Sequence, residues 1–187
     1  WRAVGEKTRW MGALNNLGIT QSYLNQESES TFRQLLDAVG DNLLERARVL
    51  LNLGMVFWNR KDFKNAELHY LSSTELSRQV GSAEIESRGW NNLGMMYQLS
   101  GNDSKAEDAY RKALALCQVT GDVEMRGLVL ANFAELTEDY EGWEEALNIL
   151  ESAGQLAVVA EFRAELPENH PFHKMANNKW SKNLGGK

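Results

Sequence analysis

Two of the three histidines are close enough in sequence to bind one metal ion together. His170 and His173 flank Pro171-Phe172, whereas His69 lies far from them in the chain. A protein zinc site uses three or four ligands, and no third ligand stands at a suitable spacing from this pair. The sequence therefore predicts that the chain holds no metal.

The other reactive residue types do not form a catalytic arrangement. Cys117 is the only cysteine, which excludes an internal disulfide, and it falls on the apolar stripe of a predicted helix, where a thiol is buried and inert. Gly185-Gly186 ends a polar tail and is not a phosphate-binding loop. The serines and aspartates form no recognisable nucleophile motif. We therefore predict that the chain is not an enzyme and uses no cofactor.

Charge narrows the classes of partner. The net charge of -6 weighs against nucleic acid, because phosphate binding requires a basic surface. No apolar run approaches the ~20 residues of a membrane span, so we expect no membrane insertion. Acidic residues gather around Tyr140 and Trp143, namely Glu135, Glu138, Asp139, Glu141, Glu144 and Glu145. They are either a solvated helix face and turn, or an acidic end of a binding surface that prefers a basic partner.

A short asparagine-containing phrase returns at a fixed interval. It occurs as Asn15-Asn16-Leu17-Gly18, Leu51-Asn52-Leu53-Gly54, Asn91-Asn92-Leu93-Gly94 and, more loosely, Ala131-Asn132-Phe133-Ala134. Gly54 and Gly94 lie 40 residues apart, as do Gly81 and Gly121. Self-similarity of this kind is typical of a solenoid built from stacked supersecondary units.

The clearest copy of the unit runs from Trp90 to Gly121 and is predicted to be a helix hairpin. A first helical face is formed by Trp90, Leu93, Gly94 and Tyr97. The stretch Gly101-Asn102-Asp103 then breaks the pattern and supplies a helix N-cap. A second apolar face follows with Ala106, Tyr110, Ala113 and Leu114. Gly94 and Ala106 are small, so the two helices are expected to touch closely.

This unit resembles the tetratricopeptide repeat, whose signature is Trp-x2-Leu-Gly-x2-Tyr, then Ala-x3-aromatic, then Ala. The matching residues are Trp90, Leu93, Gly94, Tyr97, Ala106, Tyr110 and Ala113. The preceding unit matches with Leu50, Leu53, Gly54, Phe57, Ala66, Tyr70 and Ser73, and the following one with Leu130, Phe133, Ala134, Thr137, Ala146, Leu150 and Ala153. The closing Pro of the signature is replaced by a Gly-Asp turn. The 40-residue spacing resembles the long-repeat branch of the family, found in kinesin light chains, cell-polarity adaptors and bacterial signal-transducing regulators.

The resemblance implies an all-α fold, a right-handed superhelical solenoid of helix hairpins with about four repeats and a C-terminal capping helix. The repeat array is predicted over residues 1–154, with repeats at about 9–40, 43–81, 83–121 and 123–154. The first repeat lacks several residues before Gly40, so its second helix must be short or displaced. Residues 155–166 are predicted to form the capping helix or a helix extension, and residues 167–187 a polar tail.

The second asparagine of the phrase is the strongest candidate for a binding residue. The first helix of each predicted hairpin carries an asparagine at the same position of the repeat, namely Asn16, Asn52, Asn92 and Asn132. Such repetition needs a reason, because Asn is a poor helix former. Each amide either bonds its neighbour across the stack, or pairs with the backbone of an extended peptide in the concave groove. We favour the second interpretation, and the two are compatible. The resemblance supports it, because repeats of the kinesin light chain type have a similar row of asparagines.

Neighbouring positions extend the predicted groove. Met55 and Met95 follow the asparagines and offer adaptable apolar contacts, although packing under the adjoining helix is an equal alternative. Arg48 and Arg88 share a register one turn earlier and are suited to a carboxylate. The complete set of predicted partner-binding residues is Asn16, Asn52, Asn91, Asn92, Asn132, Arg48, Arg88, Met55, Met95, Trp58, Gln98 and Glu135.

We therefore expect a protein–protein interaction scaffold that binds a peptide or helical segment of a partner in its concave groove. The alternative is a ligand- or peptide-sensing arm of a larger signalling or transcription regulator. Because the chain opens at Trp1 without Met, a larger parent chain is expected, or removal of a targeting peptide. We expect a cytoplasmic protein, or an organellar one if a transit peptide was removed.

Overall fold

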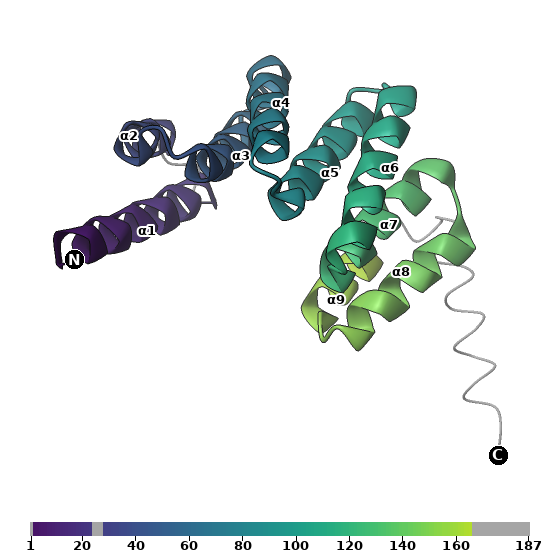
Figure 1. Ribbon diagram of the computed structural model, residues 1–187. Helices are drawn as coiled ribbons and strands as arrows, with labels where there is room; N and C mark the ends of the chain where they lie inside the picture. Colours follow the sequence, from purple (N-terminus) through teal and green to yellow (C-terminus); the bar gives the residue numbers. More distant parts are fainter. Residues whose placement is uncertain (1, 24–27, 166–187) are drawn as a thin grey trace. The chain divides into compact units, whose positions relative to one another are not determined.

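The computed structural model describes residues 2–23 and 28–165, and every regular element in these ranges is an α-helix (Figure 1). The helices are α1 (Arg2–Tyr23), α2 (Glu29–Val39), α3 (Leu43–Asn59), α4 (Phe63–Gln79), α5 (Ala83–Leu99), α6 (Asp103–Thr120), α7 (Val123–Thr137), α8 (Tyr140–Ser152) and α9 (Leu156–Glu165). The predicted all-α fold of helix hairpins is thus confirmed. The predicted polar tail, with His170 and His173, lies outside the described residues.

The recurring glycines and acidic or amide residues set where the helices end and begin. Gly81 and Gly121 each have a backbone φ of +69°, a conformation that other residues adopt only with strain. The side chain of Asp122 then accepts a hydrogen bond from the backbone N–H of Met125 at 2.9 Å, which caps α7. Asp62 caps α4 in the same way through Asn65. The glycine that recurs after 40 residues, Gly81 and then Gly121, therefore lies where one helix ends and the next is about to begin.

The chain forms two compact units, Trp1–Thr120 and Gly121–Lys187, called here the N-terminal unit and the C-terminal unit. The N-terminal unit contains three helix hairpins, α1–α2, α3–α4 and α5–α6. Successive hairpins stack through the second helix of one and the first helix of the next, α2 on α3 and α4 on α5. The helix α2 has only 11 residues, against 17 in α4. This short second helix follows from the residues missing in the first repeat.

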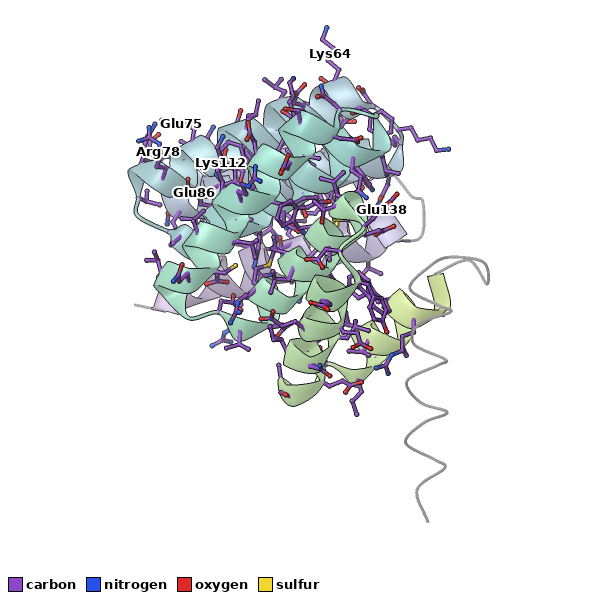
Figure 2. The ribbon with its side chains drawn as sticks, turned by 90° about the vertical axis from the view of Figure 1, so that its right-hand side faces the viewer. Lys64, Glu75, Arg78, Glu86, Lys112 and Glu138 are labelled. Carbon is purple, nitrogen blue, oxygen red and sulfur yellow. The ribbon has the colours of Figure 1, made fainter. Side chains whose placement is uncertain are left out.

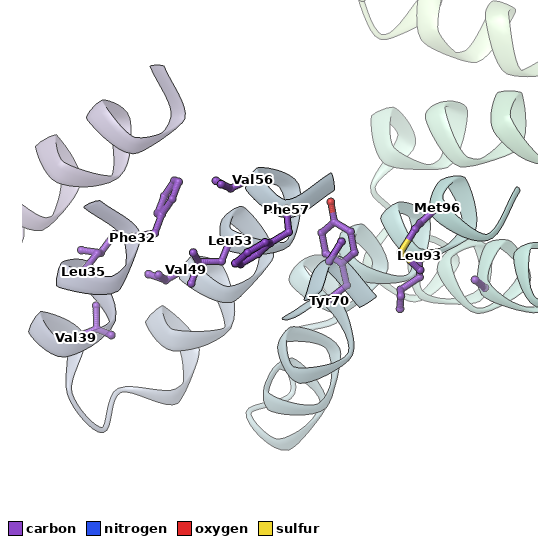
Figure 3. Close-up of a cluster of buried hydrophobic side chains, with 12 residues drawn as sticks. Phe32, Leu35, Val39, Val49, Leu53, Val56, Phe57, Tyr70, Leu93 and Met96 are labelled. Carbon is purple, nitrogen blue, oxygen red and sulfur yellow. The ribbon is translucent and has the colours of Figure 1, made fainter. Parts of the chain in front are cut away.

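Close contact within each hairpin depends on the glycine of the repeated phrase. A Cβ atom added at Gly54 would collide with the ring of Tyr70, and one at Gly94 with the ring of Tyr110. Both tyrosine side chains are almost fully buried. The core of the N-terminal unit continues from there across α2, α3 and α5 through Phe32, Leu35, Val39, Val49, Leu53, Val56, Phe57, Leu93 and Met96 (Figure 3).

The C-terminal unit contains the hairpin α7–α8 and the helix α9. Its core consists of Ala131, Ala134, Trp143, Ala146, Leu147, Leu150 and Val159. Val159 is only 1% exposed, so α9 packs its apolar side on this hairpin through its contact with α8. Val158 and Phe162 lie against the same core. The role of α9 as a cap of the array stays a prediction.

Candidate protein-binding groove

A hollow of about 650 Å³ opens on the N-terminal unit, and three successive first helices line most of it. It is lined by Met11, Gly12, Asn15 and Ile19 from α1, by Leu35 and Val39 from α2, by Glu45, Arg48, Val49, Leu51 and Asn52 from α3, and by Glu84, Ile85 and Arg88 from α5, with Asn42 at the start of α3. We call this hollow the α1–α3–α5 groove. Its size suits a few side chains of a bound segment.

The floor of the groove is apolar. Leu35, Val39, Val49 and Ile85 are all buried, and they belong to three different helices. Stacking of α2 on α3 brings the first three of these side chains together in the core of the unit. The apolar surface that a ligand could cover comes from Met11, Ile19 and Leu51, which also line the groove and are only half-buried. Covering it would favour binding through the hydrophobic effect.

Charged side chains lie along the groove at repeated positions. Arg48 on α3 pairs with Glu45 at 3.0 Å, and Arg88 on α5 pairs with Glu84 at 3.6 Å. The two arginine side chains are 52% and 53% exposed. Exposed pairs of this kind contribute little to stability, about 0–1 kcal/mol. Both guanidinium groups can therefore turn to a carboxylate of a partner at small cost.

The asparagines of the repeated phrase differ in their surroundings. The side-chain Nδ2 of Asn52 on α3 donates a hydrogen bond to Oδ1 of Asn15 on α1 at 2.8 Å. Asn16 is exposed, while Asn92 on α5 and Asn132 on α7 are half-buried. The contact of Asn52 is of the structural kind considered above, since it links the first helices of two successive hairpins. Partner binding by the asparagine row stays a prediction.

The apolar candidates lie on α3 and α5 beyond this hollow. Met55 is half-buried, and Met95 is 37% exposed. The Sδ atom of Met95 accepts a hydrogen bond from Nδ2 of Asn91 at 3.6 Å. Asn91 itself is only 7% exposed, so its side chain lies too deep for extensive contact with a partner.

Of the remaining predicted site residues, Trp58 and Gln98 contact other side chains of the N-terminal unit. Trp58 meets the ring of Phe63 edge to face, with the ring centroids 5.8 Å apart. Oε1 of Gln98 accepts a hydrogen bond from the hydroxyl of Tyr110 at 2.8 Å. Glu135 is exposed on α7, in the C-terminal unit. Of the twelve predicted residues, the α1–α3–α5 groove thus brings together Arg48, Asn52 and Arg88.

Sequence reasoning missed four polar residues of the groove, namely Asn15, Asn42, Glu45 and Glu84. Glu45 and Glu84 lie three and four residues before the arginines they pair with, a spacing that marks ion pairs on a helix and was visible in the sequence. Asn15 stands directly before Asn16 in the repeated phrase. No sequence signal showed that Asn15, and not Asn16, is the residue that meets Asn52.

A second polar network holds α4, α5 and α6 together away from this hollow. The hydroxyl of Tyr97 donates a hydrogen bond to Glu67 at 2.6 Å, and Lys105 lies 3.9 Å from the same carboxylate. Burial and this hydrogen bond raise the pKa of the Tyr97 hydroxyl above its ordinary value. About two turns further along the same pair of helices, Lys112 on α6 lies 4.1 Å from the ring centroid of Trp90 on α5. Tyr97 and Trp90, the aromatic residues of the repeat signature, therefore contribute to the packing of the repeats.

Much of the acidic cluster also has structural contacts. Asp139 caps α8 by accepting a hydrogen bond from the backbone N–H of Gly142 at 3.1 Å. Glu144 accepts a hydrogen bond from the hydroxyl of Tyr140 at 2.6 Å, and Glu145 pairs with Arg126 at 3.1 Å. Glu138, labelled in Figure 2, ends α7 in a left-handed conformation. These contacts agree with a helix face and turn, the first interpretation of the cluster.

Comparison with known proteins supports the same assignment of the repeats. Tetratricopeptide repeat models match residues 86–156 and 47–80, which together make up more than half of the chain. The chain belongs to the tetratricopeptide repeat family. Repeats of this family generally mediate protein–protein interactions and are typically non-catalytic. The matches do not distinguish the long-repeat branch, which stays a prediction.

Solved structures share the fold of this tetratricopeptide repeat protein. Among them is BtubC (BKLC) from P. vanneervenii, with a TM-score of 0.64 and 19% sequence identity. The alignment covers 90% of this chain and 72% of the BtubC chain. No curated protein matches the sequence at a significant level.

Among the described residues, no group of three or more His, Cys, Asp or Glu side chains is placed to hold a metal ion. Within the same ranges, no helix is both long and apolar enough to cross a bilayer.

Proposed function

We propose that this tetratricopeptide repeat protein binds a segment of a partner protein in the α1–α3–α5 groove. The observation that carries the proposal is the pairing of an apolar floor with two exposed arginines at equivalent positions of successive repeats. Arg48 and Arg88 lie 40 residues apart in the chain and both line the hollow. A bound segment would bury apolar side chains on the floor and place a carboxylate near at least one guanidinium.

The asparagine row adds contacts to the backbone of the bound segment. The hydrogen bond from Asn52 to Asn15 uses one of the two N–H groups of the Asn52 amide. The second N–H and Oδ1 of Asn52 still suit a peptide group of a partner. The structural and binding roles are therefore compatible at Asn52. Asn16, which is exposed, and Asn92 extend the row on α1 and α5.

The proposal is tested by affinity purification with quantitative mass spectrometry on three forms of the protein. The groove variant carries Arg48→Glu and Arg88→Glu. The matched control is Arg78→Glu on α4, because Arg78 pairs with Glu75 at the same 3.0 Å and is also largely exposed (Figure 2). We expect the wild type and the control to retain a set of interacting proteins that the groove variant no longer retains. Circular dichroism of all three forms checks that they are folded.

Equal retention of every interacting protein by the groove variant and the control would contradict the proposal. Retained proteins are then tested as purified partners, because only a direct complex has a defined affinity. Reversal of two charges at the contact is expected to weaken that complex by 10-fold or more, since each lost charge-assisted contact is worth about 1.5–3 kcal/mol.

A further inference from the structure

The charged side chains of the α1–α3–α5 groove form two rows. On α3, Glu45 lies three residues before Arg48, and on α5, Glu84 lies four residues before Arg88. Each glutamate is therefore about one turn, roughly 5 Å, nearer the start of its helix than its arginine. Since α3 and α5 are equivalent helices of successive repeats, they run in the same direction. One row thus contains the two arginines, and the other contains the two glutamates.

The two rows balance in charge. These four side chains are the charged ones among the described residues that line the groove. Each guanidinium lies 3.0 to 3.6 Å from its carboxylate, so a uniformly acidic segment that reached the arginines would also lie against the glutamates. Like charges at such distances repel, and a uniformly basic segment would meet the reverse problem at the arginines. The groove therefore favours a segment that carries charges of both signs.

The amides of the groove favour an extended segment over a helical one. The hydrogen bond between Asn52 and Asn15 uses one N–H of Asn52 and Oδ1 of Asn15. Oδ1 of Asn52 and Nδ2 of Asn15 then suit an N–H and a C=O group of a ligand backbone. A helix uses these backbone groups for its own hydrogen bonds, whereas an extended segment offers them to its neighbours.

The spacing of the rows suits the geometry of an extended segment. Its successive side chains point to opposite sides, and residues i and i+2 are about 7 Å apart on the same side. The helices α3 and α5 are in contact, and the axes of packed helices lie about 8–10 Å apart. The long arginine and glutamate side chains make up the difference. A segment that crosses α3 and α5 would thus present residues i and i+2 to one row, and i+1 and i+3 to the other.

We propose that the groove binds an extended segment of a partner protein in which acidic and basic residues alternate. The acidic side chains face Arg48 and Arg88, and the basic side chains face Glu45 and Glu84. This inference rests on the proposed function and adds the chemistry of the ligand to it.

The α1 end of the groove has room for a large apolar side chain of the same segment. Gly12 on α1 occupies the repeat position that Arg48 and Arg88 occupy on α3 and α5. A Cβ atom added at Gly12 would meet no packed neighbour within 4 Å. Met11 and Ile19, both half-buried, line the groove on the same helix. An apolar residue therefore adjoins the alternating charges.

Three short peptides with blocked ends separate the charge patterns. The alternating peptide is Gly-Leu-Asp-Lys-Asp-Lys-Leu-Gly, with a leucine at each end so that either direction of binding supplies the apolar residue. The block peptide, Gly-Leu-Asp-Asp-Lys-Lys-Leu-Gly, has the same composition and net charge. The acidic peptide, Gly-Leu-Asp-Asn-Asp-Asn-Leu-Gly, keeps only the acidic side chains. All three are too short to be helical alone. Each is titrated into the ¹⁵N-labelled protein, and the amide shifts in NMR spectra give the affinity and the place of binding.

We expect the alternating peptide to shift amides of α1, α3 and α5 and to bind at least about 10-fold more tightly than the block peptide. The block peptide puts one Asp and one Lys on each side, so half of its charged contacts become repulsive. The acidic peptide is expected to bind at least about 3-fold more weakly than the alternating one, because it leaves the glutamates without a cation.

The matched variants test the row of glutamates. In Glu45→Gln with Glu84→Gln, the acidic peptide should bind at least as tightly as the alternating one. The control is Glu75→Gln on α4, since Glu75 pairs with Arg78 at 3.0 Å, is 51% exposed and lies outside the groove. The control should keep the wild-type order. Glu84→Gln alone, at a side chain that is 60% exposed, should reduce the preference in the same direction and serves if circular dichroism shows the double variant to be unfolded.

Equal or tighter binding of the block or the acidic peptide by the wild type, at amides of the same helices, overturns the inference and leaves the proposed function standing. A double variant that keeps the wild-type order also overturns it, because the glutamates would then not contact the basic residues. If no peptide shifts amides of α1, α3 or α5, the inference is wrong, and the retention of partners by the arginine variant decides the proposed function separately.

Discussion

The side-chain amide of Asn52 on α3 donates a hydrogen bond to the Asn15 carbonyl oxygen on α1, and the two atoms are 2.8 Å apart. This bond joins the first helices of two successive hairpins beside the groove, which both residues line. The positions are neighbouring registers of the repeated phrase, and not the same register. The link therefore fixes how α1 is offset along α3.

Asn52→Ala is expected to lower the free energy of unfolding by about 0.5–1.5 kcal/mol, because the half-buried Asn15 loses its partner. Asn16→Ala is the matched control, since Asn16 is exposed on the same helix as Asn15 and Ala is the better helix former. Urea unfolding of both variants measures the difference. If Asn52→Ala were as stable as Asn16→Ala, the bond would have no structural role.

Gly94→Ala is expected to destabilise the protein by about 1–3 kcal/mol, because its Cβ collides with the buried Tyr110 ring. Gly12→Ala should do the reverse and stabilise by about 0.5–1 kcal/mol, since no atom lies within 4 Å of a Cβ on α1 at this position. Thermal melts followed by circular dichroism compare the two changes. A neutral or stabilising effect of Gly94→Ala would show that the α5–α6 contact is looser than described.

His69 is expected to make stability depend on pH. Burial lowers the pKa of its imidazole below the ordinary 6.5, and the nearby Arg33 lowers it further. The unfolded chain then binds a proton at this position more readily than the folded one, so stability falls as the pH drops through 6.5. The ring stacks on Phe57, with centroids 5.1 Å apart. His69→Phe keeps an aromatic ring there and should flatten this part of the profile between pH 5 and 7.5 (roughly the range of His titration). An unchanged slope would exclude His69 as the source.

Val159→Asp in α9 is expected to destabilise the C-terminal unit by at least about 2 kcal/mol, because it places a charge where a fully buried apolar side chain packs. Ala160→Asp, at the next and exposed position, is the control. Deletion of residues 155–187 should likewise expose the α7–α8 core and promote self-association, which size-exclusion chromatography with light scattering detects. A stable monomer after deletion would show that α9 does not cap the array.

The repeat period was enough to predict the hairpins, because the contact of Gly54 with Tyr70 recurs as Gly94 with Tyr110 and, with a Phe ring, as Gly18 with Phe32. It also placed Arg48 and Arg88 at equivalent positions, and both line the groove. The floor of that groove could not be predicted, since Leu35 and Val39 come from the one helix that breaks the period, α2. The partner of Asn52 was missed for another reason. A periodic comparison aligns equal registers, whereas the offset between packed helices brings Asn15 to Asn52.

The order of helix contacts in the N-terminal unit has a kinetic consequence. Each helix packs mainly on the next one in the chain, from α1 on α2 to α5 on α6, and the longer-range pairs are α1 with α3 and α3 with α5. Such local pairing gives a low contact order, so loops to be closed during folding are short and folding is fast. A hairpin such as α3–α4 can therefore form soon after it leaves the ribosome, before the residues of α5 are available. The part of the α1–α3–α5 groove that α1, α2 and α3 contribute would then be assembled before Arg88 of α5 is available to complete it.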